Sequence, residues 1–221
     1  MSTKVTTQTE VRLSYTYLLE AHAQDENDEP KFSTAILIPK SDTETVKALR
    51  AAINEALADG VAKKWKGKKP SDLHNPLRDG DKKEDKDGNP DELYAGHWFL
   101  NAKGPRGGAE APILLNKANE PTESSSVIYS GVYARVSLQF YPYDTRGNKG
   151  VAAGVTAVKS MEHGDALGSV VTVASAREEF GDEPGAVKDA KDEFAADDET
   201  ETKSTSSKSK PADDDDDPWK D

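Results

Sequence analysis

The chain has 221 residues, and its share of hydrophobic residues, 34% beside 32% charged, is below that of most globular proteins, so part of the chain is expected to stay outside a packed core. It contains no cysteine, which excludes disulfides, thiolate metal sites and a cysteine nucleophile and favours a reducing compartment. No apolar run is long enough to span a bilayer, and the N-terminus lacks the apolar segment of a signal peptide, so we expect a cytoplasmic protein with no membrane partner.

The formal net charge of −12 is distributed unevenly. Between Arg177 and Asp221 there are 17 acidic and 7 basic residues, a net of −10. The other 24 acidic and 22 basic residues leave a net of −2 on residues 1–176. The acidity of the whole chain therefore does not describe the surface of its main part, where local patches decide what binds.

The first elements expected along the chain are two strands that form a hairpin. Apolar and polar residues alternate over Val11–Tyr17 and over Phe32–Ile38, which is typical of half-buried strands. Residues 24–30 are polar and acidic and form the connecting loop, and Pro39 ends the second strand. The side chains expected on one face of the first strand are Val11, Leu13, Tyr15 and Tyr17.

A single long helix is expected after the hairpin. Ser41 or Asp42 can cap its first turn, and Asp59 with Gly60 is a typical stop signal. Apolar residues recur three and four positions apart, which predicts one stripe that packs against a sheet. The residues of this stripe are Val46, Leu49, Ile53 and Leu57.

The most basic segment of the chain follows the helix. Five lysines surround Trp65 within Lys63–Lys69. This segment can attract phosphates and stack one base on its tryptophan, or it is a solvated loop whose tryptophan packs onto the helix. The first interpretation selects the candidate DNA contacts Lys63, Lys64, Trp65 and Lys66.

Further strands are expected in the second half, separated by glycine-rich turns. Residues 77–92 form an acidic, turn-rich loop, and strands are expected over Tyr94–Lys103, Ile113–Leu115 and Val151–Val158. Trp98 and Phe99 are neighbours in the first of these strands. They face opposite ways, so only one of the two can lie beside a ligand.

The clearest strand pattern is Ile128–Tyr143. Its apolar positions form one face, and aromatic, basic and hydroxyl side chains form the other. Such residues stack on bases and hold phosphates, although tyrosine also favours strands for reasons of packing alone. Residues 144–150 are expected to form a turn. The candidate DNA contacts in this region are Tyr133, Arg135, Tyr141, Tyr143, Arg146 and Lys149, with Trp98 or Phe99 beside them.

These elements predict a mostly β fold, namely an OB-fold-like five-stranded Greek-key barrel with one main helix. A β-sandwich is the alternative. We expect residues 1–176 to form this DNA-binding domain and residues 177–221 to form a flexible acidic tail, because the tail is too polar to bury a core.

The sequence offers no recognisable catalytic or metal site. Its four histidines are scattered, and Walker, Gly-x-Ser-x-Gly and dinucleotide motifs are absent. We therefore predict a protein that is not an enzyme and has no cofactor, metal or catalytic residue.

Three stretches together resemble a family of tailed-phage early proteins that was first catalogued as a domain of unknown function. They are Phe32–Asp42, Leu77–Ala102 with its Leu-Arg-Asp-Gly-Asp and Tyr-Ala-Gly-His-Trp-Phe motifs, and Tyr129–Gly150. That family is similar to the OB-fold single-stranded DNA-binding proteins of short-tailed coliphages. The resemblance covers roughly Val11 to Phe180.

The resemblance implies sequence-tolerant binding of single-stranded DNA during phage replication or recombination, in the cytoplasm of the infected bacterium. It also implies an acidic tail that regulates binding and recruits phage or host replication proteins; the tail residues concerned are Asp213, Asp214, Asp215, Asp216, Asp217 and Trp219. In the family the tail ends on an aromatic, whereas here Lys220 and Asp221 follow Trp219. A homodimer is compatible with the sequence. The competing interpretation is a non-enzymatic protein-interaction module or DNA mimic that does not bind DNA.

Overall fold

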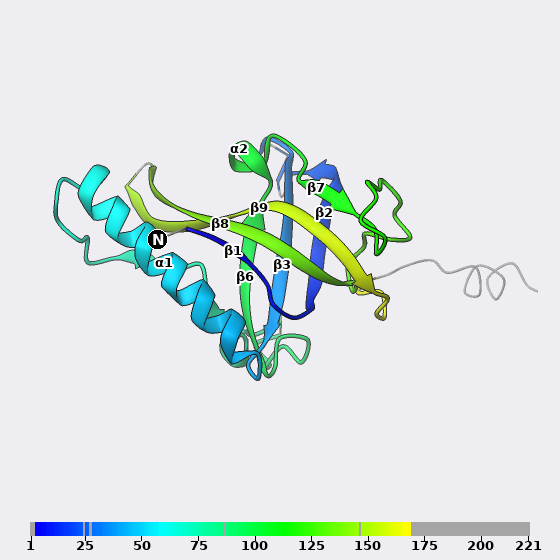
Figure 1. The fold of residues 1–221 in the computed structure, drawn as a ribbon. Helices are drawn as coiled ribbons and strands as arrows, with labels where there is room; N and C mark the ends of the chain where they lie inside the picture. The colour runs from blue at the N-terminus through cyan, green and yellow to red at the C-terminus, as the bar shows by residue number, and fades with distance from the viewer. Residues whose placement is uncertain (1–2, 24, 27, 86, 146, 169–221) are drawn as a thin grey trace, which may run out of the picture. The chain divides into compact units, whose positions relative to one another are not determined.

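Five strands pair edge to edge in a closed ring (Figure 1). The computed structural model describes residues 3–23, 25–26, 28–85, 87–145 and 147–168. Around the ring the order is β2, β3, β6, β9, β8 and back to β2, and only β6 and β9 run parallel. This closed five-stranded arrangement confirms the predicted OB-fold-like barrel rather than a sandwich. The ring strands are β2 (Val11–His22), β3 (Lys31–Pro39), β6 (His97–Lys103), β8 (Tyr133–Thr145) and β9 (Asn148–Glu162).

Shorter elements surround the ring. β1 pairs with β8, β4 and β7 pair with β9, and β5 pairs with β6. The bounds are β1 (Lys4–Thr6), β4 (Leu73–His74), β5 (Arg78–Asp79), the 3-10 helix η1 (Gly80–Lys82), the short α2 (Pro105–Gly108) and β7 (Ile113–Leu115). The predicted domain boundary at residue 176 and the acidic tail lie outside the described residues.

Alternate side chains of the ring strands point into one core. In β8, Val136, Leu138 and Phe140 are at most 1% exposed, whereas the residues between them reach the outer surface. This alternation confirms the predicted pattern. However, the strand begins at Tyr133 and not at Ile128, because the backbone turns at Gly131, where φ is +115°.

The connection between β8 and β9 is tighter than predicted. Thr145 and Asn148 are paired with each other, and Gly147 between them has a φ of +87°. Most of the residues 144–150, which were expected to form a turn, therefore belong to the paired strands. This extension carries Tyr143 and Lys149 into the ordered sheet.

A bulge in β2 reverses the predicted orientation of its aromatic residues. The pairing with β3 shifts register between Ser14 and Tyr17, and Leu18 occupies the next core position after Leu13. One extra residue in a strand moves every following side chain to the opposite face. The expectation that Tyr15 and Tyr17 share one face with Val11 and Leu13 is therefore wrong, and both tyrosines face outward.

The main helix, α1 (Thr43–Lys63), lies against β8 (Figure 1), and its buried apolar stripe joins the same core as the inward-facing side chains of that strand. Asp42 caps it by accepting a hydrogen bond of 3.0 Å from the backbone N–H of Thr45. Within the described residues, no helix is long and apolar enough to cross a membrane.

Gly60 lies inside α1 instead of ending it. A Cβ atom at this position would lie 2.7 Å from the ring of Trp65 and 2.8 Å from the Cβ of Pro142 in β8. The helix thus continues past the predicted stop, and Gly60 serves instead to let Trp65 and β8 approach the helix closely. This contact joins the end of the helix to the barrel.

We expect Gly60→Ala to lower the free energy of unfolding by about 1–3 kcal/mol, because the added methyl group overpacks this contact. In an open helix the same change would stabilise by about 1 kcal/mol. Chemical denaturation of the wild type, Gly60→Ala, Trp65→Ala and the double variant measures the effect. The penalty of Gly60→Ala should shrink when Trp65 is already alanine, and a Gly60→Ala protein more stable than the wild type would contradict this packing.

Candidate nucleic-acid interface

Two hollows on the outer face of the barrel adjoin at shared residues, and we call the two together the barrel groove. Both hollows are lined by Asn101 and Lys103 of β6. The hairpin half extends from these residues to the β8–β9 hairpin, and the aromatic half extends to the β2–β3 hairpin. The groove therefore crosses the strands of the ring.

The alternation of β6 decides which of its side chains enter the groove. Trp98, Leu100 and Ala102 pack with the core, whereas Phe99, Asn101 and Lys103 line the groove. Of the two predicted aromatics, Phe99 thus faces the groove and Trp98 faces inward. There the Trp98 ring lies 4.7 Å from the guanidinium carbon of Arg50.

The middle of the groove floor follows a row of paired residues. Tyr17 pairs with Ser33, Ser33 with Lys103, and Lys103 with Gly154. Four neighbouring strands span roughly 14 Å at the usual strand spacing. Gly154 has room for the ring of Tyr141, which lies 3.5 Å from where a Cβ of that residue would be. Small residues in the floor thus leave space between the aromatic ends.

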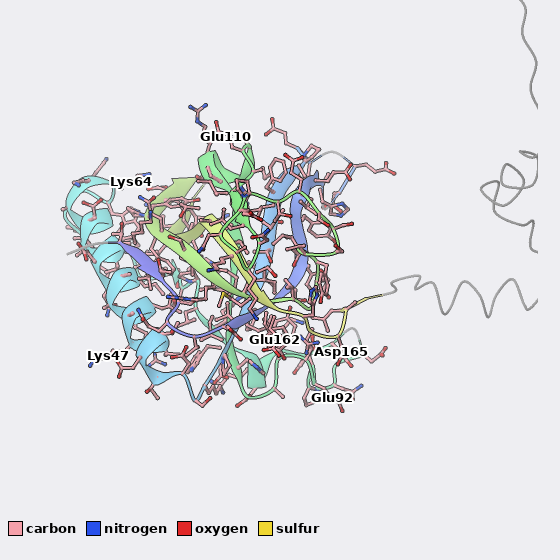
Figure 2. All side chains as sticks on the ribbon, turned by 45° about the vertical axis from the view of Figure 1, so that its right-hand side comes forward. Lys47, Lys64, Glu92, Glu110, Glu162 and Asp165 are labelled. Carbon is pink, nitrogen blue, oxygen red and sulfur yellow. The ribbon has the colours of Figure 1, made fainter. Side chains whose placement is uncertain are left out.

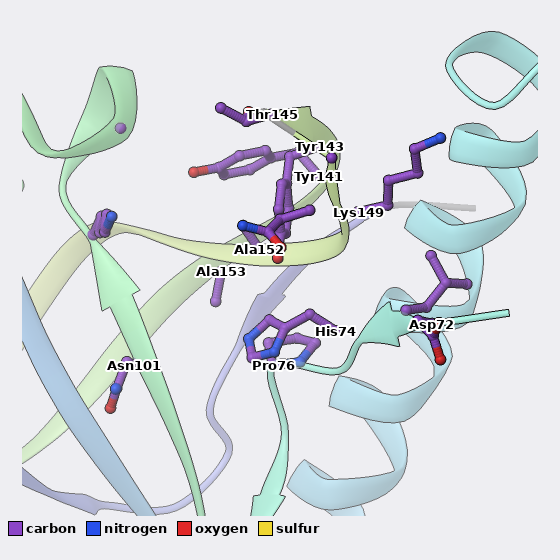
Figure 3. A pocket seen from close by; sticks show the side chains of 15 residues that line it. Asp72, His74, Pro76, Asn101, Tyr141, Tyr143, Thr145, Lys149, Ala152 and Ala153 are labelled. Atoms are coloured by element: carbon purple, nitrogen blue, oxygen red, sulfur yellow. The ribbon is translucent and has the colours of Figure 1, made fainter. Parts of the chain in front are cut away.

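The hairpin half brings together three of the predicted site residues: Tyr141, Tyr143 and Lys149 (Figure 3). Lys149 forms an ion pair of 3.4 Å with Asp144. The ring of His74, from β4, meets that of Tyr143 edge-on with 6.5 Å between centroids. Burial lowers the pKa of His74 below its usual value and the charge of Arg78 lowers it further, which favours the neutral ring.

The aromatic half combines aromatic rings with basic side chains. The rings of Tyr94 and Phe99 are nearly perpendicular, with 4.9 Å between centroids. Arg78 lies 4.4 Å from the centre of the Phe99 ring, and Lys83 lies 4.0 Å from that of Tyr94. Desolvation opposes the charge of Lys83, but its hydrogen bond to Asp91 raises its pKa on balance, so the ammonium group stays charged.

The groove is more basic than the chain as a whole. Its lining contains five cations, Lys31, Arg78, Lys83, Lys103 and Lys149, and three carboxylates, Asp28, Glu29 and Asp72. Aromatic faces and excess positive charge within one open depression are suited to an unpaired polyanion with exposed bases.

Two of the predicted DNA contacts lie elsewhere. Tyr133 and Arg135 line a separate hollow near Glu162, and the guanidinium carbon of Arg12 lies 5.7 Å from the centre of the Tyr133 ring. Arg135 donates a hydrogen bond of 3.0 Å from Nε to the carbonyl of Thr7. β8 is long enough to separate Tyr133 from Tyr141 by roughly 26 Å at about 3.3 Å per residue. The outer face of β8 thus contributes to two separate surfaces, the barrel groove at one end and the hollow near Glu162 at the other.

The basic segment after α1 does not provide a stacking aromatic. Trp65 is only 5% exposed and packs against Gly60, as in the alternative interpretation in which this tryptophan packs onto the helix. Lys64 and Lys66 are exposed, and Lys63 forms an ion pair with Asp59. Figure 2 shows Lys64 at one side of the domain, away from Glu162 and Asp165. Arg146 and the tail residues Asp213–Asp217 and Trp219 lie outside the described residues.

Most of the aromatic half was missed by reasoning from the sequence. The alternation of Phe99, Asn101 and Lys103 was visible, but Asn101 and Lys103 were not selected. The sequence pattern predicts Tyr15 and Tyr17 on the same face as Val11 and Leu13, because no residue pattern marks the bulge in β2. Other basic and aromatic residues of the groove that are not among the predicted contacts include Lys31, Arg78, Lys83 and Tyr94.

Comparisons with known proteins identify the family of this chain. The model of the family described as the single-stranded-DNA-binding protein of Enterobacter phage Enc34 matches residues 3–202. Protein p50 of Acyrthosiphon pisum secondary endosymbiont phage 1 is 32% identical over 184 residues, which is 78% of this chain and 90% of p50.

Solved structures of the Enc34 protein share the fold. The structure in complex with single-stranded DNA has a TM-score of 0.61 and 22% identity, over 75% of this chain and 88% of that one. Another structure of the same protein has a TM-score of 0.55 and 23% identity, over 78% and 88%. The family match, which extends over most of the sequence, confirms the resemblance inferred from its motifs. The chain belongs to the family of the single-stranded-DNA-binding protein of Enterobacter phage Enc34.

Proposed function

We propose that this protein binds single-stranded DNA along the barrel groove, with little preference for sequence. The observation that carries the proposal is the groove itself, with aromatic residues at both ends and Lys103 between them. In OB-folds the hairpin loops after the first and fourth strands flank the surface that binds oligonucleotides. The β2–β3 and β8–β9 hairpins occupy these places here. In addition, the related Enc34 protein has been solved with single-stranded DNA.

The physical basis is stacking together with phosphate neutralisation. Each base that stacks on an aromatic ring contributes about 1–3 kcal/mol, and every base has a face that can stack. The basic side chains of the groove displace counterions from phosphates, which favours binding at low salt and adds no sequence information.

In the cell this activity would coat and protect single-stranded DNA during replication or recombination, in the cytoplasm of the infected bacterium. We propose a binding role without catalysis. Residues 177–221 would act as an acidic segment that limits DNA binding and recruits phage or host replication proteins. Their composition, 17 acidic and 7 basic residues, supports this role. Formation of a homodimer stays a prediction from the sequence.

We expect Lys103→Gln to weaken binding to a mixed-sequence oligonucleotide and to reduce its dependence on salt. Single strands show a log–log slope of about −0.7 per phosphate neutralised, so loss of one contact should make the slope shallower by about that amount. Fluorescence anisotropy across a salt series measures both quantities. Lys47→Gln, at an exposed position of α1, is the matched control. If both variants keep the wild-type slope, Lys103 does not contact phosphate.

We expect Tyr143→Ala to weaken binding by about 1–3 kcal/mol, because its ring lies at the hairpin end of the groove. Tyr133→Ala removes the same side chain from the same strand, but from the separate hollow, and should have a much smaller effect. Titrations of both variants at one salt concentration, with melting temperatures to verify folding, make the comparison. A larger loss of affinity for Tyr133→Ala than for Tyr143→Ala would show that the barrel groove is not the surface that binds DNA.

We expect truncation after Lys210 to strengthen DNA binding at low salt. The truncation removes six aspartates and one lysine, and a tethered polyanion competes with DNA at a high effective concentration. The gain should shrink as salt screens the charges. Replacement of Asp213–Asp217 by asparagine, which keeps the length, should reproduce most of the gain. Equal affinity of the full-length and truncated proteins at low salt would exclude competition by the tail.

A further inference from the structure

Tyr15 combines two properties that rarely occur together in a strand. Its side chain is 59% exposed, and its backbone has a φ of +47°, in the left-handed region that favours glycine. The other described non-glycine residues with positive φ, Lys66, Arg106 and Asn119, lie outside the strands. A bulky aromatic is unfavourable in this conformation, and an exposed ring gains little from packing.

The bulge that holds Tyr15 is stabilised from both sides. Ser14 pairs with Ala35 and Tyr17 pairs with Ser33, so β2 has one residue more than β3 across this interval. The backbone N–H of Thr16 donates a hydrogen bond of 2.9 Å to Oγ of Ser130. Oγ1 of Thr34 donates one of 3.2 Å to the carbonyl of Ser14. Side chains thus satisfy backbone groups beside the bulge, and Tyr15 is held in its unusual conformation by its surroundings.

The bulge directs Tyr15 into the aromatic half of the barrel groove. There it lines the same hollow as Tyr17, Lys83, Tyr94 and Phe99. Tyr94 and Phe99 are 2% and 4% exposed, so little of their rings is available to a ligand. Tyr15 therefore offers the largest exposed aromatic side chain in this half of the groove.

We infer that Tyr15 is the principal base-stacking residue of the groove, and that the β2 bulge exists to present its ring to an unpaired nucleobase. This inference rests on the proposed function and adds a residue and a ligand group to it. Backbone strain in folded proteins gathers at binding sites, where the surroundings maintain it. Glycine at this position removes the aromatic ring and the backbone strain together, so Tyr15→Gly should lose affinity for DNA without losing stability.

The test compares Tyr15→Gly, Tyr15→Asn, Tyr15→Phe and Tyr15→Trp with the wild type. Anisotropy titrations use a mixed-sequence single-stranded oligonucleotide at low salt, and thermal unfolding follows stability. We expect Tyr15→Gly and Tyr15→Asn to bind roughly 5- to 150-fold more weakly, which is the range for one lost base stack. Their melting temperatures should equal or exceed that of the wild type, since glycine and asparagine tolerate positive φ. The salt slope should not change, because no charge is removed.

Tyr15→Phe and Tyr15→Trp keep an aromatic ring and should retain most of the affinity. Ile113→Ala is the matched control, since Ile113 is 63% exposed but lies outside the groove, and its binding should equal that of the wild type. Wild-type affinity in both Tyr15→Gly and Tyr15→Asn, or an equal loss in Tyr15→Trp, overturns the role of Tyr15 while the groove keeps its function. A wild-type protein that does not bind the oligonucleotide overturns the proposed function itself.

Discussion

The long antiparallel pairing of β8 with β9 closes the barrel, and the other features of the described domain depend on that closure. Partners run from Tyr133 with Glu162 to Thr145 with Asn148, and the inner side chains of both strands fill one core. A closed ring has an inner face that must be apolar and an outer face that is free to vary. The barrel groove occupies this outer face, where Tyr94 and Phe99 pack with Leu37 in a second hydrophobic cluster and Tyr15 stays exposed.

Departures from regular structure then determine where functional side chains lie. The extra residue in β2 moves Tyr15 and Tyr17 from the core side to the groove. Gly60 has the opposite role: it allows Trp65 to pack against the end of α1, which removes that tryptophan from the surface. In each case one residue decides whether an aromatic ring contributes to stability or is available to a ligand.

Charge is organised on the same local scale. The chain has a formal net charge of −12, yet five cations and three carboxylates line the groove. Because screening limits electrostatic interactions to about 8–10 Å at moderate salt, a strand bound in the proposed groove would be affected by the charges of the groove rather than by the total charge. A strongly acidic C-terminal segment is compatible with DNA binding for this reason.

The sequence by itself was enough to determine the mostly β barrel with one helix, the alternation of β8, and the family, because strand period, helical spacing and motif order are local properties of the chain. It also identified Tyr141, Tyr143 and Lys149, which lie together in the groove because one hairpin carries them. Only the tertiary structure decided that Tyr133 and Arg135 belong to another surface, that Trp65 is buried, and that Phe99 rather than Trp98 faces the groove. These outcomes, and the outward position of Tyr15 and Tyr17 at the β2 bulge, depend on strand length, on one extra residue and on contacts between segments far apart in sequence, and none of the three leaves a periodic signal in the residues themselves.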